Sequence, residues 1–217
     1  MWQVAAVRGL VRENAHACTL MLDVPEWPGH TAGQHVDVRL TAEDGYQAER
    51  SYSIASAPES PQLELVACAE LELRGPIGGP FTWRVSQGGP LLLLAGGSGL
   101  VPLMAMLRHR AAQHSDVDAR LLMSARRVED LLYPDELARI GADVHYTLTR
   151  GAPDGWSGFT GRVDAEMLQT LGPPPSARPL VYVCGPTPFV EHTADLLVAE
   201  GHSPEAIRTE RFGPTGQ

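Results

Sequence analysis

Cysteine is scarce in this 217-residue sequence, and its three cysteines are far apart. Cys18, Cys68 and Cys184 are odd in number and form no C-x-x-C pair, so they indicate neither a disulfide framework nor a zinc site. The C-x4-C-x2-C run that binds a plant-type iron–sulfur cluster is also absent. Any redox role of this chain therefore requires an organic cofactor.

Long apolar runs, a leader segment and basic clusters are absent as well. No apolar run approaches the ~20 residues that span a membrane, and residues 1–4 lack the charged start of a signal peptide, so we expect a cytoplasmic protein. The net charge is −9 and the 17 basic residues are scattered, which argues against a nucleic-acid surface but leaves a basic protein partner open. The histidines show no metal-ligand spacing, so we expect no metal.

An apolar run that ends in glycines organises the second half of the chain. Leu91–Ala95 carries no polar residue and is typical of a strand buried on both faces. Gly97 and Gly99 follow, and Pro102 suits the first turn of a helix. A strand, a glycine turn and a helix aim free N–H groups and a helix dipole at one point, which suits a phosphate. An ordinary strand-to-helix turn explains this spacing equally well.

The secondary-structure pattern changes near residue 88. Residues 2–87 contain short alternating segments between turns, which predicts a barrel of six antiparallel strands. Strands and helices then alternate, which predicts an α/β domain with five parallel strands and helices on both faces. The later strands are expected at residues 119–125, 143–149, 179–184 and 206–210, the helices at 103–110, 130–140, 162–171 and 188–201, and a loop at 156–162.

A polar strand segment in the first half carries three side chains that can bind a ligand. Arg50 and Tyr52 share one strand face, and Ser53 lies on the other. Arg50 can bind a phosphate through paired donors, and Tyr52 can pack on a flat ligand. For these three residues alone, an ordinary half-exposed strand is the simpler explanation.

Five motifs taken together resemble the ferredoxin-NADP reductase superfamily. Arg50–Ser53 resembles its R-x-Y-S flavin motif, Gly75–Phe81 its G-P-x-G-x-F and Gly97–Pro102 its nucleotide loop. Cys184–Pro186 resembles its C-G-P, and Glu210–Gly213 its E-x-F-G. The motifs follow the family's order along nearly the whole chain. The resemblance implies a reductase without an iron–sulfur domain, with a flavin-binding barrel at residues 1–88 and an NAD(P)-binding domain at residues 89–217.

The resemblance also implies how the flavin is held. Arg50 would bind its diphosphate, Tyr52 would pack against the isoalloxazine ring, and Phe212 would cover that ring. The further residues expected to contact a cofactor are Ser51, Ser53, Val66, Cys68, Gly97, Ser98, Gly99, Pro102, Ser124, Arg126, Arg127, Cys184, Gly185 and Pro186.

Three residues are expected to be catalytic by the same resemblance. Ser53 would hydrogen-bond near flavin N5, Cys184 would lie near nicotinamide C4, and Glu210 would support electron or proton movement. The residues alone leave another interpretation of Cys184 open, because most free cysteines at strand ends are small core residues.

The implied chemistry is hydride transfer from NAD(P)H to FAD, which needs two rings held face to face. Ser124 and Arg126 would bind a 2′-phosphate and favour NADPH over NADH, although solvated arginines at a helix start explain them almost equally well. A separate ferredoxin, oxygenase or haem protein would accept the electrons. The alternative is a non-catalytic NAD(P)-binding regulatory or subunit protein, and FAD against FMN stays open.

One segment departs from the family. The odd positions of Leu63–Leu73 are all apolar, which predicts one strand of about eleven residues, twice the usual ~5 to 6. The family has two strands here, separated by a long connection that lies along the flavin pyrophosphate. We favour the interpretation that residues are missing near positions 67–70, and natural shortening is the alternative.

Overall fold

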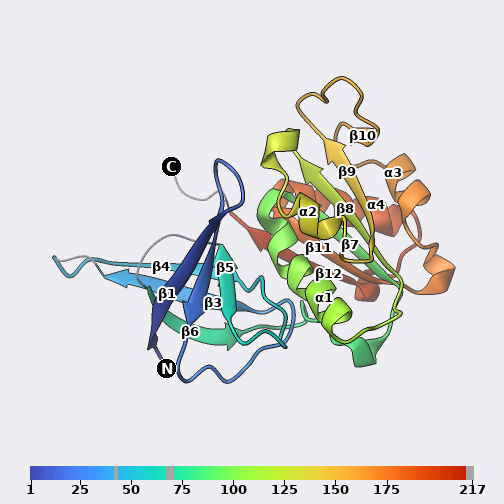
Figure 1. Cartoon of the computed structure of the whole chain (residues 1–217). Coiled ribbons are helices and arrows are strands. Elements are labelled where there is room, and N and C mark those ends of the chain that lie inside the picture. The colour runs from blue at the N-terminus through green and yellow to red at the C-terminus, as the bar shows by residue number, and fades with distance from the viewer. Residues whose placement is uncertain (42–43, 67–70, 214–217) are drawn as a thin grey trace.

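The computed structural model describes residues 1–41, 44–66 and 71–213 and contains two six-stranded sheets (Figure 1). The first half of the chain forms an antiparallel sheet, and the second half forms a parallel sheet with helices packed against it. The expected order of an all-β barrel followed by an α/β domain is confirmed.

The first sheet closes into a barrel because its two edge strands meet. Its strand order is β4-β3-β6-β1-β2-β5, with antiparallel neighbours throughout. A bridge between Ile54 and Leu65 joins the end of β4 to β5. Alternate side chains such as Leu20, Val36 and Leu73 fill the interior. The strands are β1 (Gln3–Arg12), β2 (Cys18–Asp23), β3 (His35–Thr41), β4 (Gln47–Ser53), β5 (Leu63–Val66) and β6 (Leu71–Ile77).

The second sheet has the order β10-β9-β8-β7-β11-β12 and is parallel. Both faces of β7 are buried, with Leu91 and Leu93 in the core beneath α1 and Leu92 and Leu94 in the core beneath α3 and α4. The strands are β7 (Leu91–Gly96), β8 (Ala119–Ala125), β9 (Asp143–Leu148), β10 (Phe159–Thr160), β11 (Leu180–Pro186) and β12 (Ile207–Phe212). The helices are α1 (Leu100–Ala112), α2 (Pro134–Leu137), α3 (Ala165–Leu171) and α4 (Thr187–Ala199).

The chain reverses its direction of winding between β7 and β11. From β7 it adds β8, β9 and β10 on one side, and then returns to place β11 and β12 on the other. Ligands of open parallel sheets bind at such a switch point, beyond the carboxyl ends of the strands. The glycine loop after β7 and the Cys184–Pro186 end of β11 lie at this point.

Two strand predictions were wrong in detail. The parallel sheet has six strands instead of five, because β10 forms within the segment expected to be a loop and pairs with Thr147 and Leu148 of β9. The single long strand expected at Leu63–Leu73 is two strands, because β5 pairs with β2 while β6 pairs with β1 and β3. The predicted chain omission near residues 67–70 lies outside the described residues.

Two helices are shorter than expected, and each has a local cause. Tyr133 has a positive φ of 51° and precedes a proline, so the helix expected at residues 130–140 is reduced to α2. Asp164 accepts a hydrogen bond from the Met167 amide at 2.9 Å and thereby fixes the start of α3 at Ala165. Of the helices in the described part of the chain, none has the length and apolar character needed to cross a membrane.

The segment between the sheets packs firmly against the second one. Phe81 and Trp83 are buried in the core beneath α1. The Tyr182 hydroxyl donates to the Thr82 carbonyl at 2.9 Å, and Arg208 donates to the same oxygen at 2.9 Å. A domain boundary at residues 88 and 89 stays a prediction.

Candidate functional site

The two sheets meet where β4 ends beside β12. The Ser53 hydroxyl donates a hydrogen bond to the Glu210 carboxylate at 3.2 Å, although the two residues are 157 positions apart. Glu210 is in turn the register partner of Cys184 on β11. The three residues expected to be catalytic are therefore brought together at the carboxyl ends of two parallel strands.

Burial changes the acidity of two of these groups. Burial raises the pKa of the Glu210 carboxyl, and the hydrogen bond from Ser53 offsets part of that rise. Burial also raises the pKa of the Cys184 thiol well above its ordinary value, and the charge of Glu210 raises it further. The thiol is fully buried and packs in the apolar core, so this cysteine is a neutral side chain at neutral pH.

The predicted faces of β4 are confirmed. Tyr52 packs against the barrel core, while Ser53 points to Glu210 on the opposite face. Arg50 is exposed, and its guanidinium donates to the neighbouring Glu49 carbonyl at 2.8 Å, which uses one of its five N–H donors. The expected contacts of Arg50 with a phosphate and of Tyr52 with a flat ring stay predictions.

Of three other predicted flavin contacts, the structure describes the surroundings of Ser51. The Ser51 hydroxyl donates to Asp37 at 2.7 Å, and Asp37 also accepts from Arg74 at 2.6 Å. The hydroxyl of Ser51 is therefore hydrogen-bonded to a neighbouring barrel strand. Val66 ends β5. Cys68 lies outside the described residues.

The glycine loop packs directly against the end of β11. A Cβ atom at Gly99 would lie 2.0 Å from the Cys184 carbonyl oxygen, so only glycine fits there. Gly97 has a positive φ of 56°, and the position of its missing Cβ is open space. Ser98 is exposed beside it, and Pro102 lies in the first turn of α1. The loop therefore has open space for a phosphate on one side and a fixed backbone contact on the other.

Residues at the ends of β11 and β12 complete this edge. Gly185 is buried, and Pro186 is exposed where α4 begins. Phe212 ends β12 as the register partner of Pro186, and its ring packs partly against the core beneath α1. Its predicted position over a flavin ring stays a prediction.

Basic side chains lie where the next strands end. Ser124 is half-buried at the end of β8, and Arg126 and Arg127 are exposed just after it. The Arg127 guanidinium lies 3.6 Å from the Glu129 carboxylate. This ion pair makes Arg126 the more available of the two arginines.

Two further arginines lie at this edge, outside the residues expected to contact a cofactor. Arg150 follows β9 and donates its backbone N–H to the Arg126 carbonyl at 2.9 Å, and Arg162 follows β10. Both are exposed. The signal for Arg150 was its place after a predicted strand, whereas the position of Arg162 depends on the unpredicted β10.

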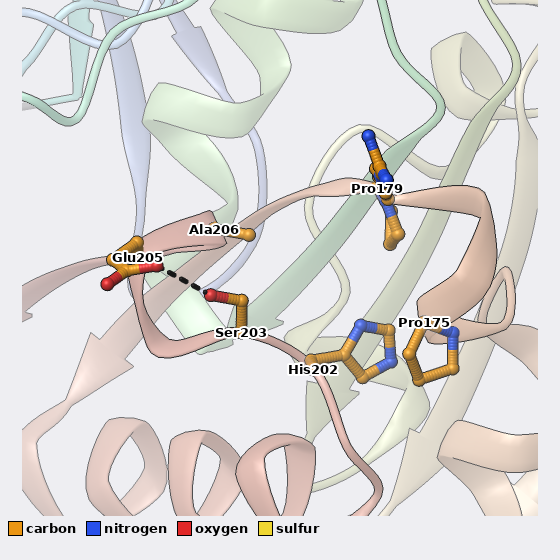
Figure 2. A pocket seen from close by; sticks show the side chains of 7 residues that line it. Pro175, Pro179, His202, Ser203, Glu205 and Ala206 are labelled. Carbon is orange, nitrogen blue, oxygen red and sulfur yellow. Dashed lines mark hydrogen bonds between the residues drawn. The ribbon is translucent and has the colours of Figure 1, made fainter.

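A cavity of about 360 Å³ lies at the opposite ends of β11 and β12 (Figure 2). Its walls include Pro175, Pro179 and His202. Burial lowers the pKa of the His202 imidazole. Because the cavity lies at the amino ends of the strands, it is separate from the candidate site.

A closed antiparallel barrel followed by a doubly wound parallel sheet is the fold of ferredoxin reductase-like proteins. Residues 93–195 match the oxidoreductase NAD-binding domain. The chain is 34% identical over 209 residues to ferredoxin–NADP reductase B of Sorangium cellulosum, across 83% of this chain and 84% of that protein. The chain belongs to the ferredoxin-NADP reductase family.

Two further proteins are informative. The glycine betaine monooxygenase reductase subunit of Pseudomonas aeruginosa is 29% identical over 208 residues, across 84% of this chain and 56% of the relative, so the chain spans little more than half of that protein. The flavohaem-like FAD/NAD-binding domain of nitric oxide dioxygenase from Vibrio cholerae has the same fold, with a TM-score of 0.85 at 20% identity across 98% of this chain and 99% of that one.

Proposed function

We propose that this chain is a flavin-dependent oxidoreductase that transfers a hydride from NAD(P)H to FAD and passes the electrons to a separate acceptor. The observation that carries the proposal is the 3.2 Å contact between Ser53 and Glu210. It joins the strand with the flavin motif to the strand beside the C-G-P segment. Bound FAD would supply the chemistry, because it accepts a hydride and releases electrons one or two at a time.

In this proposal, the residues of this chain bind and orient FAD and the nicotinamide nucleotide. Arg50 holds the FAD diphosphate and Tyr52 packs on the ring, while the glycine loop and the first turn of α1 hold the phosphates of the nicotinamide nucleotide. Glu210 lies beside Ser53, and burial raises the pKa of its carboxyl, so this group is placed to take up or release a proton there. The flavin-binding part is residues 1–88 and the nucleotide-binding part residues 89–217.

NADPH is the proposed electron donor. Arg126 follows β8, and Arg150 and Arg162 follow the two neighbouring strands, so three exposed guanidiniums border one edge. Such an edge is suited to a 2′-phosphate, with Ser124 as an additional hydroxyl donor. A cytoplasmic location, where the nucleotide is available, is part of the proposal.

The acceptor is proposed to be a ferredoxin, an oxygenase or a haem protein. The support comes from a relative that is itself named a monooxygenase reductase subunit. None of the described residues forms a cluster of histidine, cysteine and carboxylate ligands for a metal.

An anaerobic visible spectrum of the purified protein tests the proposal. Flavin bands that bleach on addition of NADPH, faster than with NADH, are the expected result. A protein that stays colourless when FAD is added would contradict the reductase function. Retained NADPH binding in that case would favour the non-catalytic alternative.

A further inference from the structure

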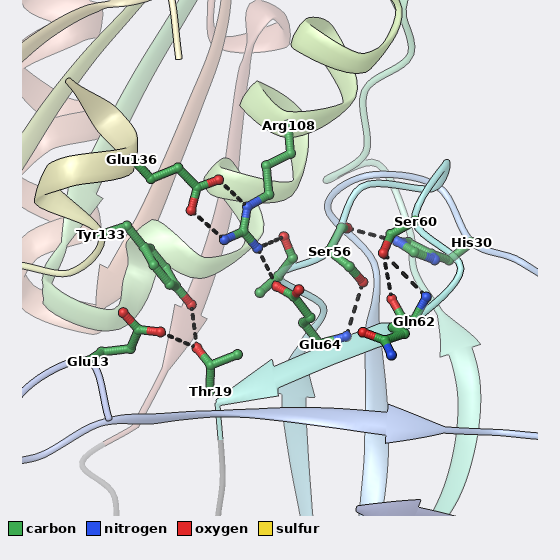
Figure 3. A network of polar contacts seen from close by, with 11 residues as sticks. Glu13, Thr19, His30, Ser56, Ser60, Gln62, Glu64, Arg108, Tyr133 and Glu136 are labelled. Carbon is green, nitrogen blue, oxygen red and sulfur yellow. Dashed lines mark hydrogen bonds and ion pairs between the residues drawn. The ribbon is translucent and has the colours of Figure 1, made fainter. Parts of the chain in front are cut away.

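Arg108 contacts both the barrel and the α/β half of the chain. Arg108 lies on α1, the helix that begins directly after the glycine loop. Figure 3 shows its guanidinium between the helical part of the molecule and the barrel. Its side chain is only 17% exposed.

Every polar contact of this guanidinium ties α1 to another element. Its Nε and Nη2 atoms each donate to the Glu136 carboxylate of α2 at 2.7 Å. Its Nη1 atom donates to the Glu64 carboxylate of β5 at 2.7 Å and to the Ala55 carbonyl at 3.0 Å. The guanidinium carbon lies 5.0 Å from the centre of the Tyr133 ring. Arg108 therefore contacts both the barrel and the nucleotide-binding half.

The barrel side of this contact continues directly from the flavin motif. Ala55 is two residues after Ser53, and its N–H donates to the Glu64 carbonyl at 2.9 Å. The Glu64 N–H donates in turn to the Ser56 hydroxyl at 3.1 Å. Arg108 thus holds a hydrogen-bonded unit that begins two residues after the end of β4.

The Arg108 cation and the two carboxylates that it contacts stabilise one another. Burial lowers the pKa of the Arg108 guanidinium. The hydrogen bonds and charge of Glu136, together with the charge of Glu64, raise it by more, so the pKa lies above its ordinary value. The cation therefore persists at every pH at which the protein is folded. Without it, two half-buried carboxylates would face each other.

Neighbouring side chains on α1 reinforce the same contact. The His109 Nδ1 atom lies 2.7 Å from the Glu59 carboxylate, and Gln113 donates to the same oxygen at 2.7 Å. These contacts hold a loop adjacent to Ala55, and His109 also accepts a hydrogen bond from the Val85 N–H at 3.4 Å. Arg108 is distinguished by its simultaneous contacts with α2, β5 and the chain after β4.

We propose that Arg108 is a positioning residue for hydride transfer, because it fixes the distance between the flavin-binding strand β4 and the glycine loop. The inference rests on the proposed function. A displacement of about 1 Å between two reacting rings can lower a rate about a hundredfold without weakening the binding of either ring. Arg108 is expected to affect the rate at saturation and not the affinity.

Arg108→Lys tests this role, because lysine keeps the charge but lacks the planar fork that serves three partners. In anaerobic stopped-flow measurements we expect FAD content and NADPH affinity to be unchanged and flavin bleaching at saturating NADPH to be slowed about a hundredfold. Glu64→Gln, which keeps an acceptor oxygen, should cause a smaller loss of the same kind. An unchanged rate in Arg108→Lys, or a rate lost only together with FAD, would overturn the proposal.

Arg120→Lys is the matched control. Arg120 is also partly buried, but it donates to the Leu171 carbonyl at 2.9 Å and pairs with Asp118 at 3.4 Å, both within the nucleotide-binding half. The flavin bleaching rate of Arg120→Lys should equal that of the wild type. If Arg120→Lys slowed bleaching as much as Arg108→Lys, the effect would belong to any partly buried arginine replaced by lysine.

Amide hydrogen exchange gives a readout that does not require turnover. The Ala55 amide should exchange faster in Arg108→Lys and not in Arg120→Lys, because of these two arginines Arg108 contacts this segment and Arg120 does not. Unchanged exchange in Arg108→Lys would contradict the positioning role. If the wild type fails to bleach while the exchange result holds, the proposed function fails and the contact between the two halves stands.

Discussion

Gly97 and Gly99 are two residues apart in one loop, yet their surroundings differ. A methyl group at Gly99 would collide with the Cys184 carbonyl oxygen, whereas one at Gly97 would enter open space. We expect Gly99→Ala to lower the free energy of unfolding by about 1 to 3 kcal/mol. Gly97→Ala should cost about 1 kcal/mol through its positive φ and also weaken NADPH binding. Urea unfolding and nucleotide titration measure both effects, and equal stability losses would contradict the packing argument.

Arg126 and Arg127 allow a comparison of neighbouring side chains. Arg126→Ala should raise the KM for NADPH about tenfold, the usual effect of a lost hydrogen bond to a charged group, and leave the KM for NADH unchanged. Arg127→Ala should change neither, because Arg127 is paired with Glu129. Steady-state kinetics with both nucleotides decide this, and an equal rise for NADPH and NADH would exclude a 2′-phosphate contact.

Glu210 gives the protein a specific pH dependence. Burial raises the pKa of its carboxyl above the ordinary value of 4.5, so the folded state binds more protons than the unfolded state in the interval between these values. The free energy of unfolding should therefore fall as pH rises through that interval. Glu210→Gln removes this fall, so the variant should gain stability relative to the wild type with rising pH. Denaturant unfolding across this range tests it, and parallel curves would contradict it.

Individual residues could be chosen from the sequence where a motif carries its own chemistry. Arg50 and Tyr52 have side chains that suit a phosphate and a ring, whereas Glu210 was chosen from the family resemblance alone, and the roles of all three stay predictions. The contact between Ser53 and Glu210 depends on how two sheets pack across 157 residues, which no local pattern encodes. Arg108 was missed for the same reason, because its partners come from three separate elements.

Secondary-structure elements were predicted where hydrophobic residues follow one clear period. The buried strand β7 and the helix α1 follow from Leu91–Ala95 and the glycines after it. β10 has only two residues, which is too short to show a period, and it exists because β9 offers it a free edge. The apolar alternation of Leu63–Leu73 could not separate β5 from β6, because both strands share the same period of two.

The start of α3 depends on one capping side chain. Asp164 accepts a hydrogen bond from the Met167 amide at 2.9 Å. Asp164→Ala should lower the free energy of unfolding by about 1 kcal/mol, while Asp164→Asn, which keeps an acceptor oxygen, should retain most of the stability. Thermal unfolding of the two variants tests the cap, and equal losses would assign the effect to the charge of Asp164 instead.

On the scale of the whole molecule, arginine provides every permanently cationic side chain, because the sequence contains no lysine. The guanidiniums form ion pairs between distant elements, as in Arg39 with Glu72, Arg74 with Asp37 and Arg108 with Glu64. Planar guanidiniums bind carboxylates through two donors and stay charged at any pH at which the protein is folded. The barrel and the α/β half are thus held by contacts of fixed geometry, which suits a reaction between two separately bound rings.

Flavin binding should therefore raise the thermal stability of the whole chain. A ligand that binds only the folded state adds about 2.7 kcal/mol at a free concentration about 100 times its Kd, which corresponds to a rise in Tm of about 5 to 10 °C for a chain of this size. We expect FAD to produce this rise in the apoprotein and riboflavin, which lacks the phosphates, to produce much less. Arg50→Ala should leave the Tm without FAD unchanged, because Arg50 is exposed and bonds only to its neighbour's carbonyl. The same variant should lose most of the FAD-dependent rise, and a full rise in Arg50→Ala would show that the diphosphate is held elsewhere.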